Sequence, residues 1–193
     1  MSNQEENIRE YFQQLERSYY MDAHKGMADF DEAVAIGYGQ TISQPSLVLA
    51  MTLALDVHPE SRVLEIGTGS GFQTDVLAAF SKKVFTVERI EPLYEKAREK
   101  LGEAGFTNIQ YRLGDGSSGW KEHAPYDRIM VTAAASKIPA ALIEQLEKGG
   151  KMVIPVGSSF DQELTLIEKD EKGQITSTFL MHVVFVRLEG DYD

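Results

Sequence analysis

Three glycines at alternate positions follow a short apolar segment in the first half of the chain. Gly67, Gly69 and Gly71 come directly after Arg62–Ile66 and directly before another largely apolar segment. Glycines let the backbone turn tightly and approach a ligand, and the N-terminus of a following helix would point at that ligand. The pattern indicates a nucleotide-type loop, although a plain strand-to-helix turn without a ligand gives the same spacing.

An acidic residue, Glu88, ends the next apolar segment, Val84–Val87, twenty-one residues after Gly67. Doubly wound folds place an acid here, where its carboxylate accepts hydrogen bonds from ribose hydroxyls. The dinucleotide fingerprint has its third glycine one residue later than this chain does, which makes a nicotinamide dinucleotide the weaker candidate. Glu65 would repel phosphates but attract an ammonium group. S-Adenosylmethionine carries an ammonium group, and we expect it to be the cofactor.

A further acidic candidate lies in the turn-forming sequence Gly114-Asp115-Gly116. At the end of a third strand, Asp115 would accept a hydrogen bond from the amine of adenine, whereas Asp-Gly is equally favourable as plain turn chemistry. The sequence offers few residues for other kinds of catalysis. The chain has no cysteine, which excludes thiolate nucleophiles and disulfides, and its four histidines lack the spacing of metal ligands.

The elements that must position these residues alternate between strand-like and helix-like segments from about Arg62 onward, which predicts an α/β fold with a parallel sheet. The expected strands are Arg62–Ile66, Val84–Val87, Ile109–Leu113, Arg128–Thr132 and Met152–Ile154. The expected helices run from the glycines to about Phe80, from Pro92 to Leu101 and from Ile138 to Leu146, with Gly149-Gly150 ending the last. A doubly wound sheet of this kind brings the glycine loop, Glu88 and Asp115 to one edge.

The last part of the chain departs from this alternation. From Glu163 the residues alternate around a Lys172-Gly173 turn, and a long β-prone segment, Phe179–Leu188, follows. This pattern predicts a hairpin that closes one edge of the sheet in the antiparallel sense.

The segment before the sheet is expected to be helical. Its apolar side chains recur at helical spacing at Ile8, Tyr11, Phe12 and Leu15, which predicts an amphipathic helix packed on the domain. A second helix is expected over Pro45–Leu55. Between them we expect Gly37-Tyr38-Gly39 to form a flexible joint.

The composition is that of a globular domain with a formal net charge of −11. An acidic chain resists association with other polyanions, so we expect no nucleic acid partner. The first twenty residues contain no apolar core of a signal peptide, and no apolar stretch is long enough to cross a bilayer. We therefore expect a cytoplasmic protein without a membrane partner. The oligomeric state is not predicted.

Taken together, the motifs resemble the protein-L-isoaspartate O-methyltransferases, class I S-adenosylmethionine-dependent methyltransferases that initiate repair of isomerised aspartyl residues. The segment that looks specific to this family is Gly37-Tyr38-Gly39-Gln40-Thr41-Ile42-Ser43-Gln44-Pro45. Further agreement is found at Val63–Gly71, Val87-Glu88-Arg89, Gly114-Asp115-Gly116, Pro125–Ile129, Thr132-Ala133-Ala134, Gln145-Leu146, Ile154–Gly157 and Phe185-Val186. The resemblance implies a Rossmann-like methyltransferase sheet and one domain over residues 1–193. Residues 1–60 would form its helical substrate-side segment, and residues 61–193 its cofactor-binding core.

The resemblance also implies a reaction and a set of site residues. A methyl group would pass from S-adenosylmethionine to the carboxylate of an L-isoaspartyl residue in a damaged protein or peptide. Ser43 would orient this carboxylate, with Thr41 and Gln40 shaping the same loop, although a serine before Gln44-Pro45 is also a natural helix cap. The expected cofactor-binding residues are Glu65, Gly67, Thr68, Gly69, Ser70, Gly71, Glu88, Arg89, Asp115, Gly116 and Thr132; no metal is expected.

The chain departs from the family pattern at several positions. It has Tyr19-Tyr20-Met21-Asp22 where members usually have a Phe-Val-Pro-like stretch, and Phe72 and Asp75 replace the usual Tyr and Ala. Two alternatives therefore stay open: methylation of another carboxylate or small molecule with the same cofactor, and a non-catalytic S-adenosylmethionine-binding protein.

Overall fold

The apolar segments between residues 62 and 157 form five parallel strands of a seven-stranded sheet. The computed structural model, which describes residues 3–190, places the strands in the order β5-β4-β3-β6-β7-β8-β9. The parallel strands are β3 (Arg62–Ile66), β4 (Lys83–Glu88), β5 (Ile109–Leu113), β6 (Tyr126–Val131) and β7 (Leu146–Gly157). The chain winds outward from β3 to β5 and then in the other direction through β6 and β7, so the predicted doubly wound sheet is confirmed.

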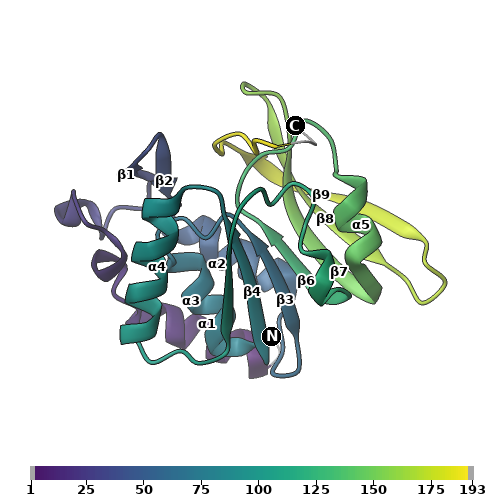
Figure 1. The fold of residues 1–193 in the computed structure, drawn as a ribbon, viewed down its shortest axis with the longest axis horizontal. Coiled ribbons are helices and arrows are strands. Elements are labelled where there is room, and N and C mark those ends of the chain that lie inside the picture. The colour runs from purple at the N-terminus through teal and green to yellow at the C-terminus, as the bar shows by residue number, and fades with distance from the viewer. Residues whose placement is uncertain (1–2, 191–193) are drawn as a thin grey trace.

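Two antiparallel strands complete the sheet beyond β7. Strand β8 (Gln162–Lys169) pairs with both β7 and β9 (Ile175–Val183). The predicted C-terminal hairpin is confirmed, and in Figure 1 it extends from the end of the sheet that lies away from α4. Strand β9 ends at Val183 rather than at Leu188, because the chain then leaves the ladder and Arg187 forms an isolated parallel bridge with Ala134.

Helices cover both faces of the sheet (Figure 1). They are α1 (Asn3–Gln14), α2 (Pro45–Leu55), α3 (Phe72–Phe80), α4 (Glu91–Glu103) and α5 (Ala140–Gln145). Single 3₁₀ turns occur at η1 (Arg17–Tyr20), η2 (Lys25–Met27) and η3 (Lys121–His123). No helix among residues 3–190 is long and apolar enough to cross a membrane.

Successive residues of the buried strands point to opposite faces of the sheet and enter two separate apolar clusters. Val63 of β3 joins the cluster that contains α1 to α4, whereas its neighbours Leu64 and Ile66 join the cluster that contains α5 and Trp120. Trp120 anchors the loop between β5 and β6: its backbone N–H donates to Gln145 Oε1 at 2.8 Å.

The structure corrects two local predictions. Gly149-Gly150 does not end a helix, because α5 ends at Gln145 and β7 runs through both glycines. Gly37-Tyr38-Gly39 is not a flexible joint. It connects β1 (Val34–Gly37) and β2 (Gln40–Ile42) as a tight hairpin, with positive φ angles of 56° at Tyr38 and 72° at Gly39.

The N-terminal segment is fixed to α3 by buried hydrogen bonds. Asp75 of α3 is 2% exposed, and its carboxylate accepts hydrogen bonds from the hydroxyls of Tyr11, at 2.7 Å, and Tyr20. The predicted amphipathic helix is confirmed as α1, whose Ile8 is buried in the core. Desolvation raises the pKa of Asp75, and the two hydroxyl donors oppose that shift.

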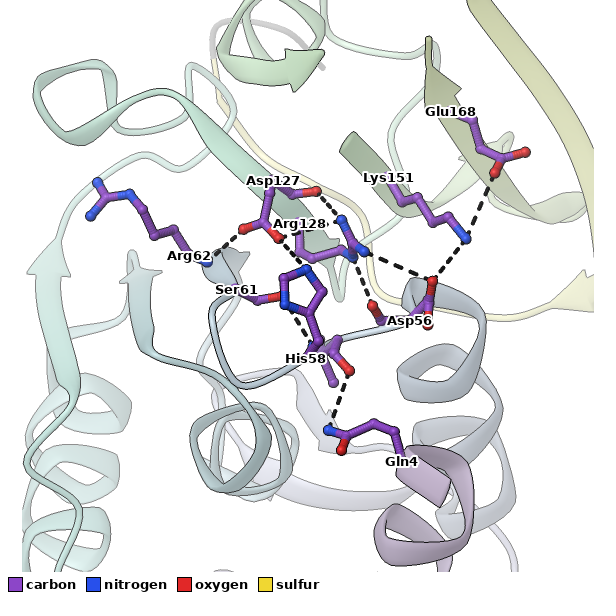
Figure 2. A network of polar contacts seen from close by, with 10 residues as sticks. Gln4, Asp56, His58, Ser61, Arg62, Asp127, Arg128, Lys151 and Glu168 are labelled. Carbon is purple, nitrogen blue, oxygen red and sulfur yellow. Dashed lines mark hydrogen bonds and ion pairs between the residues drawn. The ribbon is translucent and has the colours of Figure 1, made fainter. Parts of the chain in front are cut away.

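A polar network occupies the opposite end of the sheet from the glycine loop (Figure 2). Asp127, at the start of β6, accepts a hydrogen bond from the backbone N–H of Arg62 at 2.5 Å and lies 3.3 Å from the imidazole of His58. The buried Arg128 donates to the carbonyl of Asp56 at 2.9 Å. The Tyr126-Asp127-Arg128 motif thus fixes the C-terminal end of α2 to the first residues of β3 and β6.

Candidate functional site

A cavity opens at the carboxyl ends of β3, β4 and β6, where doubly wound sheets bind ligands. It brings together eleven of the predicted site residues: Gln40, Thr41, Ser43, Gly67, Thr68, Gly69, Ser70, Glu88, Arg89, Gly116 and Thr132. Three others, Glu65, Gly71 and Asp115, do not line it. The loop residues 40–43 and the glycine loop, which are far apart in sequence, therefore share one cavity.

The glycine loop has the shape that its sequence predicts. Gly67 has a φ of 94°, and a Cβ at this position would overlap the hydroxyl of Thr132. That hydroxyl donates to the carbonyl of Gly67 at 2.7 Å, which ties the loop to the end of β6. A side chain on Gly116 would likewise overlap Ile66. Glycine is therefore required at both positions for the backbone to pack this closely against Thr132 and Ile66.

Glu88 lines the cavity with a rigidly held carboxylate. Its two oxygens accept hydrogen bonds from the backbone N–H groups of Gly69, at 2.8 Å, and Ile90, at 2.9 Å. The side chain is 5% exposed. Since a carboxylate oxygen can accept two hydrogen bonds, each retains a lone pair for a hydroxyl donor. These acceptors, beside the glycine loop, fit the ribose hydroxyls of S-adenosylmethionine.

Glu65 does not face the cavity, contrary to our expectation of a direct contact with the cofactor. Strand alternation turns it toward α3, where it is fully buried and accepts hydrogen bonds from Thr74 at 2.6 Å and Thr86 at 2.7 Å. Its Oε1 atom has no hydrogen-bond partner among the described residues. Thr86 lies 2.6 Å from the hydroxyl of Thr68, a residue of the cavity wall, so hydroxyls connect Glu65 to the cavity indirectly.

Asp115 and Gly71 have local roles in the loops that carry them. The carboxylate of Asp115 accepts hydrogen bonds from the backbone N–H of Ser117 at 2.7 Å and from its hydroxyl at 2.9 Å, which is turn chemistry. Gly71 has a φ of 89° and begins α3, packed against Ala97 and Leu101 of α4. The hydrogen bond from the amine of adenine to Asp115 stays a prediction.

The hydroxyl of Ser43 is not a helix cap. Gln44 is the N-cap residue of α2, and it makes no side-chain capping hydrogen bond. The capping acceptor comes instead from Asp31, whose carboxylate accepts the backbone N–H of Ser46 at 2.8 Å and the amide of Gln44 at 3.0 Å. No hydrogen bond to the Ser43 hydroxyl is found among the described residues, so this donor is available to a ligand in the cavity.

Arg17 fixes the backbone of the Ser43 loop. Its side chain is 5% exposed, and its two terminal nitrogens donate to six backbone carbonyls at 2.8–3.4 Å. These carbonyls belong to Met27, Ala28, Phe30, Glu32, Ile42 and Ser43. One guanidinium thus joins the segment before β1 to the loop after β2. Desolvation lowers its pKa, but an arginine stays charged at neutral pH.

The C-terminal segment after β9 crosses the cavity beside β6. Ala134 forms backbone hydrogen bonds of 2.8 Å with both Val186 and Leu188, and Leu188 is buried. Glu189 then pairs with Arg89 at 2.7 Å, although both side chains are about half exposed. These contacts bring residues from the end of the chain into the cavity wall.

Sequence patterns missed Arg17 and the segment 186–189. A single arginine on a short polar stretch carries no periodic signal, and its burial depends on carbonyls distant in sequence. The residues after Val183 continue a β-prone pattern, and this pattern predicts that they belong to the hairpin. Only the charges at Arg187 and Glu189, which end that apolar run, indicated a change of environment.

Comparisons with known proteins identify the family of the chain. The family model described as Protein-L-isoaspartate(D-aspartate) O-methyltransferase (PCMT) matches residues 2–192. The chain is 50% identical over 171 residues to "Protein-L-isoaspartate O-methyltransferase 2" of Syntrophobacter fumaroxidans, which covers 88% of this chain and 69% of that protein. It is 54% identical over 156 residues to a protein of the same name from a Polaromonas species, which covers 80% and 74%.

Solved structures show the same relationship. A protein-L-isoaspartate O-methyltransferase superposes with a TM-score of 0.87 at 25% identity, over 99% of this chain and 62% of that chain. A Plasmodium falciparum protein described as a β-aspartate methyltransferase, in complex with S-adenosyl-L-homocysteine, superposes with a TM-score of 0.82 at 26% identity, over 97% and 91%. With a family model that spans nearly every residue, this chain belongs to the protein-L-isoaspartate(D-aspartate) O-methyltransferase family.

Proposed function

We propose that the chain transfers a methyl group from S-adenosylmethionine to the free carboxylate of L-isoaspartyl residues in damaged proteins or peptides, and so initiates their repair. Family membership supports the reaction. The single structural observation that carries it is the unpartnered hydroxyl of Ser43, which lines the same cavity as the glycine loop and Glu88. A hydroxyl donor next to a nucleotide-type floor fits a carboxylate substrate held beside an adenosyl cofactor.

The reaction requires positioning rather than acid–base chemistry. A carboxylate with a reference pKa of about 4 is already ionised at neutral pH, so no general base has to remove a proton. The cofactor supplies an electrophilic methyl group on a sulfonium. Ser43 donates a hydrogen bond to one oxygen of the substrate carboxylate and orients the other for attack. Such alignment can contribute up to about 7–11 kcal/mol to lowering the barrier.

The other residues hold the two reactants in place. Glu88 would accept hydrogen bonds from the ribose hydroxyls, and the backbone of Gly67–Gly69 would line the cofactor site. Thr132 keeps the glycine loop attached to β6, and Arg17 keeps the carbonyl of Ser43 fixed. Thr41 and Gln40 form the wall between the cofactor and the entering substrate. Residues 1–60 thus supply the groups proposed to hold the reacting carboxylate, and residues 61–193 supply the groups proposed to hold the cofactor.

The proposed partners and location follow from the same substrate. Isoaspartyl-containing proteins and peptides are the partners, and nucleic acid is not among them, consistent with the net charge of −11. The cytoplasm is the proposed location.

One assay tests the substrate. The protein is incubated with methyl-labelled S-adenosylmethionine and matched peptides that contain either isoaspartate or aspartate, and base-labile label is counted. We expect labelling of the isoaspartyl peptide only. If calorimetry detects cofactor binding but neither peptide is labelled, the protein either methylates another substrate or binds the cofactor without catalysis.

A Ser43→Ala variant tests the role of the hydroxyl. A hydrogen bond to a charged group is worth about 1.5–3 kcal/mol, so we expect kcat to fall roughly 10- to 100-fold. The free energy of unfolding should change by less than about 0.5 kcal/mol, because the hydroxyl caps no helix. Ser177→Ala, on the exposed face of β9, is the matched control. A loss of stability near 1 kcal/mol with full turnover would restore the helix-cap role.

A further inference from the structure

A second cavity, of about 860 Å³, adjoins the Ser43 loop on the side away from the glycine loop. Its walls are the first turns of α2, the residues before β8, and the end of β9. Thr41 and Ser43 line both cavities. We call this second cavity the flanking groove. Its volume lies in the range of small-ligand sites.

The flanking groove is apolar at its rim. Phe160 is 100% exposed, Val184 is 84% exposed and Met181 is 39% exposed, and all three line the groove together with Leu47 and Ala50 of α2. Large apolar side chains gathered at one concave surface commonly mark a binding site. Since the same groove continues into the wall that carries Ser43, its occupant is expected to be part of the substrate.

The charges of the flanking groove are limited to one pair. Among its lining residues only Asp161 carries a carboxylate, and the imidazole of His182 lies 3.6 Å from it. Neither Gln44, the N-cap residue of α2, nor Ser46 in its first turn offers a cation to an acidic ligand, and the apolar rim offers none either. An uncharged, apolar side chain therefore fits this groove better than an acidic one.

The chemistry of the substrate explains why the groove must be occupied. An isoaspartyl residue in a polypeptide has chain on both sides of the reacting carboxylate. When that carboxylate reaches Ser43, at least one flanking segment has to leave the cofactor cavity across Thr41 and Ser43. We propose that this segment enters the flanking groove, and that Phe160 and Val184 select an apolar side chain next to the isoaspartyl residue. The proposal rests on the proposed function and adds a sequence preference to it.

The test uses isoaspartyl hexapeptides that differ at one flanking position. Leucine or serine is placed on the N-terminal side in one pair and on the C-terminal side in the other, and kcat/KM is measured for each. We expect a preference for leucine of about three- to tenfold, on the side that enters the groove. Equal values in both pairs would overturn the proposal while leaving the proposed function intact. Absence of labelling in every peptide would instead contradict the proposed function.

Two variants assign the preference to the groove. Phe160→Ala and Val184→Ala should raise KM for the leucine peptide about threefold or more and leave kcat, the KM of the serine peptide and the KM of the cofactor unchanged. Both side chains are exposed, so folding should not suffer. Ile175→Ala is the matched control, because Ile175 is 42% exposed at the end of β9 that lies away from the groove. If the leucine preference survives in both variants, the groove does not select the flanking residue.

Discussion

Arg17 shows how a single residue can determine the position of another that does the chemistry. Its guanidinium contacts the carbonyls of Ile42 and Ser43, and it also contacts four carbonyls of the segment before β1. A planar fork of donors suits such a ring of acceptors, whereas a lysine ammonium has only three donors at a single point. The geometry of the loop after β2 therefore depends on the shape of the side chain as well as on its charge.

We expect an Arg17→Lys variant to fold but to turn over slowly. Displacement of a reacting group by about 1 Å can lower the rate about 100-fold, so kcat for an isoaspartyl peptide should fall by roughly 10- to 100-fold. The dissociation constant of S-adenosylmethionine should change little, because the glycine loop does not touch Arg17. Kinetics and calorimetry check the two quantities. Arg9→Lys on the exposed face of α1 is the control, and an equal effect in both variants would contradict the expectation.

Glu65 makes stability depend on pH. Burial raises the pKa of its carboxyl from 4.5 to about 8, against the opposing hydrogen bonds from Thr74 and Thr86. Between these two pKa values the folded chain keeps a proton that the unfolded chain has lost, so the free energy of unfolding falls as pH rises. The slope for one proton is about 1.4 kcal/mol per pH unit at most. The stabilisation is complete below about pH 4.5 and is lost as pH passes through about 8.

A Glu65→Gln variant should remove this contribution. We expect the difference in stability between pH 5 and pH 8 to become smaller than in the unsubstituted chain, as measured by urea denaturation at a series of pH values. The exposed Glu147→Gln serves as the control and should retain the original slope. An unchanged slope in Glu65→Gln would show that the carboxyl is ionised in the folded state.

The residues of the site were predictable to different degrees. The glycines and Glu88 could be placed from their spacing alone. The tight turn requires a backbone conformation that glycine adopts readily, and Glu88 is fixed by its place at the end of a strand. The orientation of Glu65 could not. Both faces of β3 are buried, so its sequence shows no polar face that would reveal which way a given side chain points. The capping of α2 by Asp31 could not be predicted either, because Asp31 lies outside the helix that it caps.

At the scale of elements, the N-terminal segment depends on its anchor in α3. Tyr11 comes from α1 and Tyr20 from η1, and their hydroxyls share the carboxylate of Asp75. Arg17, which binds the carbonyl of Ser43, belongs to the same segment. The hydrogen bonds that anchor η1 therefore also help to fix the Ser43 loop. Tyr20 and Asp75, which lie far apart in the sequence, are thus partners of each other.

A Tyr20→Phe variant should weaken this anchor. It removes one buried donor to Asp75 while keeping the ring packed against Phe72. We expect the free energy of unfolding to fall by about 1–3 kcal/mol in denaturant titrations. Tyr94→Phe, a partly buried residue in the first turn of α4, is the matched substitution. A change no larger than that of the control would mean that the hydroxyl of Tyr20 contributes little.

The predicted elements were correct where the apolar pattern that defines an element lies within that element. Strands β3 and β5 have the predicted bounds, and α2 does as well. Strand β7 was underestimated because its first residues depend on pairing with β6, including Tyr126 with Leu146, which no local pattern reports. The β1–β2 hairpin was missed because its turn places Tyr38, rather than the usual asparagine or glycine, at a positive φ.

At the scale of the whole molecule, the sheet is polar at one end and open to ligands at the other. The network around Asp127 ties α2 to the amino ends of β3 and β6, and the cavities lie at their carboxyl ends. The sequence predicted this division in part, because a doubly wound sheet places loops of this kind at one edge. The flanking groove was not predictable, because it requires the C-terminal hairpin to reach α2.

Strand β9 is the outermost strand of the described sheet, and it exposes Phe179 and Ile175 without a lysine, arginine or proline along Ile175–Val183. An edge of this kind is a template on which a second copy can pair. The net charge of −11 opposes such pairing, but its reach shrinks to about 8 Å at physiological salt. We therefore expect sedimentation velocity to show self-association that grows with added salt and that Phe179→Lys suppresses. A chain that stays monomeric at every salt concentration would contradict this. If the association is observed, the ionic strength around the protein sets its solubility through β9, an edge strand that pairs with only one neighbour in the described sheet.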